Sequence, residues 1–246
     1  SGMGTLDRLF PSQSPTVAAS FEAAVGAIPM GGLVALGAQW YGVTESEGAS
    51  GRGTVFSYHA ATGLALKSDL TSSVGTIAEG PLLTGAAGEL LGVASEGGLS
   101  GHGTLFKISS AGVRTRLLSF TGTAGSARGR RPRGPLTLSG IHYYGVTEEG
   151  GLANTGTLFR FSPAGVLTTL AQFGTTGPRS PRGGLVAGGV AQHFADRGQQ
   201  VVADDRVVLR QDLQGDVLVH HFRHQRAEGF ELVDVAGIHQ HAVGQG

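Results

Sequence analysis

The residues best suited to chemistry are histidines near the C-terminus, because imidazole nitrogens are common zinc ligands. Six of the nine histidines lie at or after His193. Alternate residues of a strand point to the same side, so His239 and His241 can present two nitrogens to one zinc ion, with His221 or Asp205 completing the site. A polar, exposed tail explains the same residues without a metal. We favour the tail, because no carboxylates are recognisable that would orient the imidazole rings.

A second set of candidates consists of carboxylates in glycine-rich stretches. Carboxylate and carbonyl oxygens are ligands that calcium prefers. Each stretch, however, supplies only one or two carboxylates and lacks the spaced Asp/Asn pattern of a dedicated calcium loop. Solvated turns are therefore the favoured interpretation, and zinc and calcium remain the only ions with candidate ligands. The same residues are candidate contacts for a partner, together with His102: Glu45, Glu47, Glu96, Glu148 and Glu149.

A run of arginines forms the third set, namely Arg128, Arg130, Arg131 and Arg133. Guanidinium groups bind phosphates and acidic polymers. No aromatic residues alternate with these arginines, and the 18 basic residues of the chain are balanced by 18 acidic ones. We therefore favour a solvated connector that contributes to a partner-binding face, and we predict no nucleic-acid partner.

These residues are placed by a segment that recurs about every fifty residues. It reads Tyr-Gly-Val-Thr or a close variant, at Tyr41–Thr44, Leu91–Ala94 and Tyr144–Thr147. A Gly-Thr-x-Phe segment follows each copy at a constant interval, at Gly53–Phe56, Gly103–Phe106 and Gly156–Phe159. A repeat of this length buries its apolar faces mainly against its neighbours, so it dictates the architecture.

Each repeat contains four short apolar runs separated by glycine-rich turns, with strand-forming residues enriched. Four strands in 40 to 50 residues are typical of one blade of a β-propeller. We predict an all-β propeller or propeller-like array of about four blades, each with four antiparallel strands. The propeller region is 1–190, with repeats near 31–80, 81–133 and 134–182. The 43 glycines, well above the usual ~7% share, fit the recurring tight turns.

The two ends of the chain are less regular. Gly2, Thr5 and Phe10 match the fourth run of a repeat, which predicts that the N-terminal strand closes the last blade as its outer strand. The tail 191–246 is either a diverged last blade, with strands near 207–213, 216–222 and 230–235, or a separate C-terminal segment. A truncated chain, closure by a second molecule and a frameshifted fourth repeat remain as alternatives.

Other chemistry finds little support in the residues. The chain has no cysteine, which excludes disulfides and thiolate metal sites. It has no Gly-x-Ser-x-Gly elbow, and we predict no catalytic or cofactor-binding residue. Aromatic residues that recur in equivalent places are expected in the core between blades, whereas Trp40 lies outside these columns and is a candidate binding spot. The core aromatics are Tyr41, Phe56, Phe106, Tyr144, Phe159 and Phe173.

The succession of Tyr-Gly-Val-Thr, Glu-Gly-Gly, Gly-Thr-Leu-Phe, a Ser-Pro-Ala-Gly turn and Thr-x-Leu-x-x-Phe resembles the GloVer repeat of bacterial choice-of-anchor proteins. The resemblance covers about 31–190 and the first ten residues, and after Val190 the expected Tyr-Gly-Val-Thr does not appear. The family implies exported, surface-anchored, propeller-like arrays without an agreed enzymatic activity.

The function expected from these patterns is non-enzymatic. We expect an extracellular or cell-surface module that binds a protein or carbohydrate through loops on one propeller face. Two alternatives stay open. One is a metal-dependent hydrolase or lyase with its site at the propeller channel or the tail histidines. The other is a structural repeat protein that forms homo-oligomers by completing blades between chains. No run of eighteen apolar residues occurs, so no membrane span is expected.

Overall fold

The computed structural model describes residues 2–9, 11, 14–85, 88–176, 179–188, 207–211, 217–223 and 231–234. All helical or strand structure in these ranges is β-strand, which confirms the all-β prediction. The same ranges contain no helix with the length and apolarity needed to cross a membrane.

Each of the three predicted repeats forms one antiparallel sheet with its strands in sequence order. Unit 1 consists of β3 (Ala27–Leu36), β4 (Gln39–Ser46), β5 (Thr54–His59) and β6 (Gly63–Asp69). Unit 2 consists of β7 (Leu83–Thr84), β8 (Leu90–Ala94), β9 (Thr104–Ile108) and β10 (Arg114–Ser119). In unit 3 the first strand is split into β11 (Arg130–Pro132) and β12 (Thr137–Ser139), which both pair with β13 (His142–Glu149). The sheet continues with β14 (Thr157–Phe161) and β15 (Leu167–Gln172).

The N-terminal residues form a separate hairpin of β1 (Thr5–Arg8) and β2 (Thr16–Ser20). The prediction that the first strand closes the last blade is therefore wrong, as is its alignment with the fourth run of a repeat. The Phe21 amide donates a 3.0 Å hydrogen bond to the Gly4 carbonyl, and Leu70 in unit 1 donates an equivalent bond of 2.9 Å to Gly53. By comparison with unit 1, β1 therefore corresponds to the third strand of a unit and β2 to the fourth.

The C-terminal sheet differs from the three units. It consists of β16 (Leu185–Gly188), β17 (Val207–Gln211), β18 (Val217–Arg223) and β19 (Glu231–Asp234), so strands do form near the predicted tail runs. β16 is parallel to β17, whereas the first two strands of every complete unit are antiparallel. The tail strands therefore do not reproduce the pairing pattern of the repeat.

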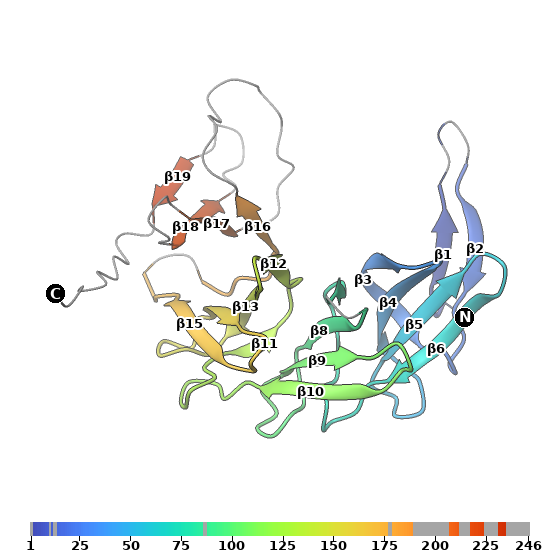
Figure 1. Ribbon diagram of the computed structural model, residues 1–246, viewed down its shortest axis with the longest axis horizontal. Helices are drawn as coiled ribbons and strands as arrows, with labels where there is room; N and C mark the ends of the chain where they lie inside the picture. The colour runs from blue at the N-terminus through green and yellow to red at the C-terminus, as the bar shows by residue number, and fades with distance from the viewer. Residues whose placement is uncertain are drawn as a thin grey trace.

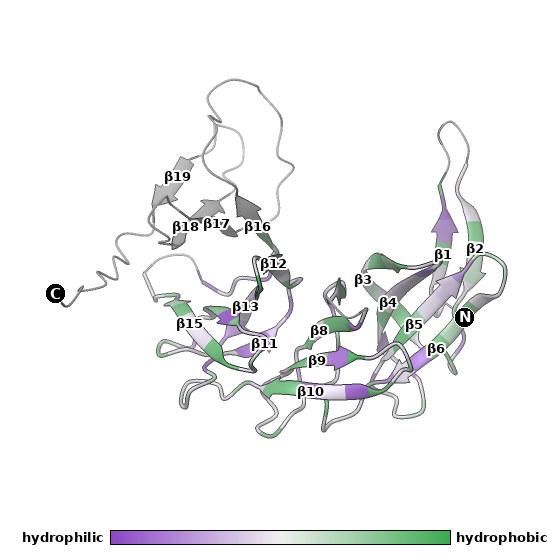
Figure 2. Ribbon diagram, in the orientation of Figure 1, coloured by the Kyte–Doolittle hydropathy of each residue, from purple (hydrophilic) through white to green (hydrophobic). Residues whose placement is uncertain are grey.

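The sheets follow one another in an arc, and the core lies between successive sheets (Figure 1). Three buried clusters fill these interfaces, one between units 1 and 2, one between units 2 and 3, and one between unit 3 and β16. Five of the six predicted core aromatics are buried in these clusters, and the sixth, Phe56, is buried against Phe21. Trp40 is 47% exposed, as expected for a residue outside the recurring aromatic positions. Along β10 the residues change from hydrophilic at the start of the strand to hydrophobic toward its end (Figure 2). The described residues form no closed ring.

The two threonines spaced by ten residues form a buried pair in units 1 and 3. The hydroxyls of Thr44 and Thr54 are 2.9 Å apart, and those of Thr147 and Thr157 are 2.8 Å apart. The first threonine also accepts a hydrogen bond from the backbone amide of the second, at 3.0 and 3.1 Å. This pair ties the second strand to the third where the strands enter their loop. Unit 2 has Ala94 at the first position.

Candidate functional site

One short segment, which we call the entry segment, leads into the first strand of each unit. Its four copies share the pattern x-[Pro/Ala]-x-Gly-[Gly/Pro]-Leu and lie at 28–33, 77–82, 131–136 and 180–185. The first residue of every copy has a positive φ between 53° and 59°, although none is glycine: Ile28, Ile77, Arg131 and Ser180. A left-handed conformation is costly for such residues, so the surrounding packing must hold it in place.

A hydrogen bond to the preceding unit supplies part of that restraint. The amide of the first entry-segment residue donates to a carbonyl just before the third strand of the preceding unit. Ile28 donates to Met3 at 2.9 Å, and Arg131 donates to His102 at 3.0 Å. Ile77 and Ser180 donate equivalent bonds of 3.5 and 2.8 Å. The entry segment is therefore the backbone link between adjacent units.

Arg131 and Arg133 of the arginine run lie in the third copy of this entry segment, and their side chains are only 35% and 21% exposed, so the prediction of a solvated connector is wrong for these two residues. Arg130 pairs with Glu149 and Pro132 with Thr147, which places β11 beside the end of β13. The pairing brings the arginines to the acidic stretch of the same unit. Arg128 contributes its carbonyl, which accepts a 3.4 Å hydrogen bond from the Thr157 hydroxyl.

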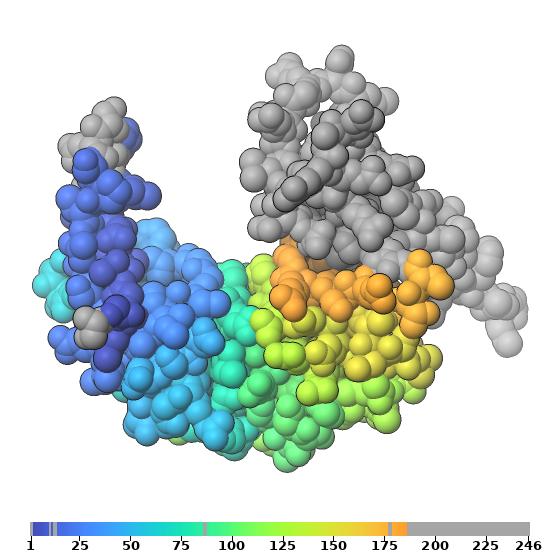
Figure 3. Space-filling model, turned by 180° about the vertical axis from the view of Figure 1, so that it is seen from behind, coloured from blue at the N-terminus to red at the C-terminus, as the bar shows by residue number. Residues whose placement is uncertain are grey.

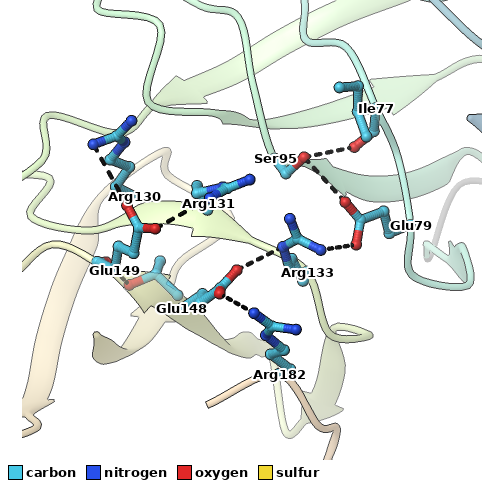
Figure 4. A network of polar contacts seen from close by, with 10 residues as sticks. Ile77, Glu79, Ser95, Arg130, Arg131, Arg133, Glu148, Glu149 and Arg182 are labelled. Atoms are coloured by element: carbon cyan, nitrogen blue, oxygen red, sulfur yellow. Dashed lines mark hydrogen bonds and ion pairs between the residues drawn. The ribbon is translucent and has the colours of Figure 1, made fainter. Parts of the chain in front are cut away.

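The third residue of the entry segment joins neighbouring units through ion pairs (Figure 4). Arg133 approaches Glu79, the equivalent residue of unit 2, at 2.6 Å between Nη1 and Oε2. Its Nε lies 2.6 Å from Oε2 of Glu148, without the alignment of a hydrogen bond. Glu148 also pairs with Arg182, the equivalent residue of the fourth copy. The chain Glu79, Arg133, Glu148, Arg182, which we call the charged relay, thus crosses three successive entry segments.

A second pair of arginines surrounds Glu149. Arg131 contacts it at 3.1 Å and Arg130 at 3.4 Å. The hydrogen bond to Glu149 raises the pKa of Arg131 further above its usual range, with smaller support from the charges of Glu148 and Glu96. Glu148 is the most buried acid of the cluster, with 7% of its side chain exposed. Because guanidinium groups neutralise both carboxylates, the cluster is suited to holding units together and not to general-base chemistry.

The loop between the second and third strands of each unit is called the front loop and covers residues 47–53, 97–103 and 150–156. Two contacts fix each copy. Its second residue donates a backbone hydrogen bond to the segment that follows the preceding fourth strand, as Gly98 does to Ser72 at 2.8 Å. The next amide is bound by the last side chain of the unit's own fourth strand, as Leu99 is by Ser119 at 3.1 Å and Leu152 by Gln172 at 2.7 Å.

The tips of two front loops carry exposed leucines. Leu99 is 80% exposed and Leu152 is 71% exposed, and both occupy the same position of the repeat. Unit 1 has Ala49 there, with its amide bound by Asp69 at 2.7 Å. A side chain on a fixed loop loses little conformational freedom when a partner binds, so these leucines are well placed as contacts.

A pocket of about 250 Å³ lies between units 1 and 2 beside the first front loop. It is lined by Glu45, Ser46, Gly51, Arg52, Thr76 and Ile77. It combines one carboxylate and one guanidinium with backbone groups. The predicted partner-contact residue Glu45 therefore borders this pocket.

The remaining predicted residues are distributed around the front loops. Glu47 begins the first front loop with a φ of 64°, at the position that Gly97 and Gly150 occupy in the other units. Glu96 bridges Thr76 across the junction of units 1 and 2. His102 supplies the carbonyl bound by Arg131, and its imidazole lies beside Gly122, where an added Cβ would be 2.9 Å from Nε2.

The predicted metal site lies largely outside the described residues. His239 and His241 fall there, and only the backbone of His221 is described, within β18. Within the part of the chain that the structure describes, no three His, Cys, Asp or Glu side chains are grouped so as to hold a metal ion.

Glu79 and Arg182 complete the charged relay and were not among the residues predicted from the sequence. Both occupy the column of Arg133, which Met30 fills in unit 1. The signal was the glycine that follows each of them, since all four copies share it. The equivalence of these positions was hard to recognise, because one copy has a glutamate where two others have an arginine.

No curated protein matches this chain. A family model described as Gloeobacter/Verrucomicrobia repeat matches residues 1–194, which include the hairpin, all three units and β16. The match covers every copy of the front loop and of the entry segment, and it ends before β17. The chain therefore belongs to the Gloeobacter/Verrucomicrobia repeat family.

Proposed function

We propose that the chain is a non-enzymatic, extracellular or cell-surface repeat module that binds a protein partner through its front loops. The observation that carries the proposal is the pair of exposed leucines, Leu99 and Leu152, at equivalent tips of fixed loops. Exposed apolar side chains that are rigidly presented are typical of protein contact surfaces. The location outside the cell rests on the resemblance to anchored bacterial repeat proteins.

The geometry that brings the loops to one face is that of a β-propeller, and we propose that arrangement for the units. Its support is the close approach of successive entry segments. A Cβ on Gly80 would lie 2.8 Å from the Arg133 carbonyl oxygen, and a Cβ on Gly134 would lie 2.4 Å from that of Gly183. Neighbouring entry segments thus meet backbone to backbone, as the innermost segments of blades around a common axis do.

Charged and polar groups of the entry segments and front loops could form the polar rim of an interface that has the two leucines at its centre. The charged relay and Glu149 lie in the entry segments and at the base of the third front loop, while the pocket beside Glu45 lies at the first. Protein interfaces commonly surround apolar contacts with such polar groups. The front-loop face therefore offers both parts of an interface.

The test is comparative binding by two double variants. Leu99→Ser/Leu152→Ser removes the front-loop contacts. Val113→Ser/Val166→Ser is the matched control, because these valines are 62% and 59% exposed and lie at the turns between third and fourth strands, at the opposite end of each sheet. Each immobilised chain is incubated with a bacterial outer-surface protein fraction and, separately, with a glycan array.

A protein that the wild type and the valine variant retain, and that the leucine variant loses at least tenfold, supports the proposal. Equal retention by all three chains overturns the front-loop assignment. Binding confined to the glycan array overturns the protein partner in favour of a carbohydrate. Melting temperatures of the three chains, measured by circular dichroism, establish that both variants are folded.

A further inference from the structure

The N-terminal hairpin reproduces half of a repeat unit. β1 carries Gly4-Thr5-Leu6, which matches the Gly-Thr-Leu at the start of β9 and β14. Its pairing with β2 is irregular between Leu6 and Asp7, and β14 pairs with β15 irregularly between Leu158 and Phe159, the same place in the repeat. The hairpin is therefore a third and fourth strand with the geometry of a complete unit.

Every complete unit shows which strand lies on the other side of such a third strand. It is the second strand, paired antiparallel with glycine opposite phenylalanine and valine opposite valine or leucine. In unit 3 the pairs are Gly145 with Phe159, Val146 with Leu158 and Thr147 with Thr157. The register is the same in units 1 and 2, apart from alanine at the threonine position of β8.

β1 has only one strand partner among the described residues, namely β2. The consequence is visible in the burial of its side chains. Thr5 is exposed and Leu6 is partly buried. All six of their equivalents in the complete units are 0% exposed. Thr5 corresponds to Thr54, Thr104 and Thr157, and Leu6 corresponds to Val55, Leu105 and Leu158. The hairpin also projects beyond the neighbouring sheet in the space-filling view (Figure 3).

We propose that the open edge of β1 binds an incoming strand of the second-strand type, with a Gly-Val-Thr core, supplied by a separate repeat-bearing chain. The strand would run antiparallel to β1, with its threonine opposite Thr5, its valine opposite Leu6 and its glycine opposite Asp7. Backbone hydrogen bonds along the edge provide affinity, and the side-chain columns provide register and specificity.

The occupant is defined by the repeat itself. Among the described residues, three second strands occupy the equivalent place, and each is already paired on both sides. A second strand from another molecule would bury Thr5 and Leu6 as its counterparts are buried. Its threonine hydroxyl would reach that of Thr5, as Thr147 and Thr157 approach to 2.8 Å.

Asp7 gives the edge of β1 a preference for a basic residue in the incoming strand, which the complete units do not have. In those units a phenylalanine ring covers the opposite glycine, and a Cβ at Gly145 would lie 2.6 Å from the Phe159 ring. Asp7 stands in that column of β1. A lysine opposite Asp7 would therefore fit and form a cross-strand charge pair, which strengthens binding by about twofold to fivefold.

The test uses a fluorescent peptide of residues 141–150 and the full chain. Binding is followed by anisotropy, and amide exchange of 5–8 and 16–20 is followed by mass spectrometry. Three further peptides are compared: a scrambled one, one with Val146→Asp and one with Gly145→Lys. The chain variant Leu6→Asp is paired with the control Val17→Asn, because Val17 lies on β2 and is 63% exposed. Asparagine is used because Val17 stands opposite Asp7, where a second carboxylate would repel it.

We expect the peptide to bind and to slow exchange in 5–8. The Val146→Asp peptide and the Leu6→Asp chain should bind at least about tenfold more weakly, since each loses a buried apolar contact. The Val17→Asn chain should bind like the wild type. Retained protection of 16–20 in the Leu6→Asp chain shows that its hairpin is folded.

Three results would overturn the proposal. The first is a peptide that fails to bind although 16–20 are protected. The second is a scrambled peptide that binds equally well, which would mean unspecific edge pairing. The third is protection of 5–8 that rises with protein concentration without peptide, which would assign the edge to a second copy of this chain.

Discussion

At the scale of single residues, the repeat provides its own comparison, because equivalent positions differ by one side chain. The threonine pair is the clearest case. Thr147 receives the Thr157 amide at 3.1 Å, donates to the Glu149 carbonyl at 2.8 Å and contacts the Thr157 hydroxyl. Ala94 stands at this position in unit 2, so that unit lacks the hydroxyl.

We expect Thr147→Ala to lower the free energy of unfolding by about 1–3 kcal/mol, because it leaves the buried amide of Thr157 without its partner and removes one of the two contacts of the Thr157 hydroxyl. Ala94→Thr should raise it by about 1 kcal/mol, since it adds the same contact with Thr104. Urea unfolding of both variants checks this. A destabilised Ala94→Thr chain would show that unit 2 has no room for the hydroxyl.

The threonine columns also show what the sequence could predict. Their constant interval of ten residues predicted the second and third strands of each unit, and the structure pairs these strands. Asp7 concealed the corresponding third strand at the N-terminus, because phenylalanine or a similar apolar residue was expected there. This one difference was therefore enough to align the first ten residues with the fourth strand of a unit, although they correspond to the third.

At the scale of elements, the entry segments are where sequence reasoning fell short. The copies at 28–33, 77–82 and 180–185 carry at most one charged residue each. The two arginines of the third copy therefore suggested a solvated connector and not a repeated segment. Backbone conformation identifies the equivalence, because Ile28, Ile77, Arg131 and Ser180 share a positive φ. No residue type signals that conformation here, since the restraint comes from the hydrogen bond to the preceding unit.

The charged relay leads to a prediction about neighbouring units. Glu148→Gln should lower the free energy of unfolding by about 2–3 kcal/mol, because it leaves Arg133, which is 21% exposed, with one carboxylate partner. Glu149→Gln is the matched control and should cost less than about 1 kcal/mol, since its arginine partners are 35% and 45% exposed. Equal effects in urea unfolding would mean that the relay does not connect the units.

At the scale of the whole molecule, the arrangement depends on how closely successive units approach. Each unit buries one sheet face against the next, and the entry segments meet where their glycines lie. Exposed leucines occur at the front-loop tips, and β1 has a single strand partner within the part of the chain that the structure describes. Stacking therefore fixes the positions of the loops, while their sequences are free to differ from unit to unit.

Gly134→Ala tests this dependence directly. The added Cβ would lie 2.4 Å from the Gly183 carbonyl oxygen, which is backbone and cannot rotate away. We expect a loss of about 1–3 kcal/mol in unfolding free energy, together with faster amide exchange in 180–185, because the fourth entry segment must move. Gly174→Ala is the control, since a Cβ there meets nothing within 4 Å, and it should leave stability within about 1 kcal/mol. If both variants unfold alike and exchange in 180–185 is unchanged, close contact between entry segments does not hold the units in place.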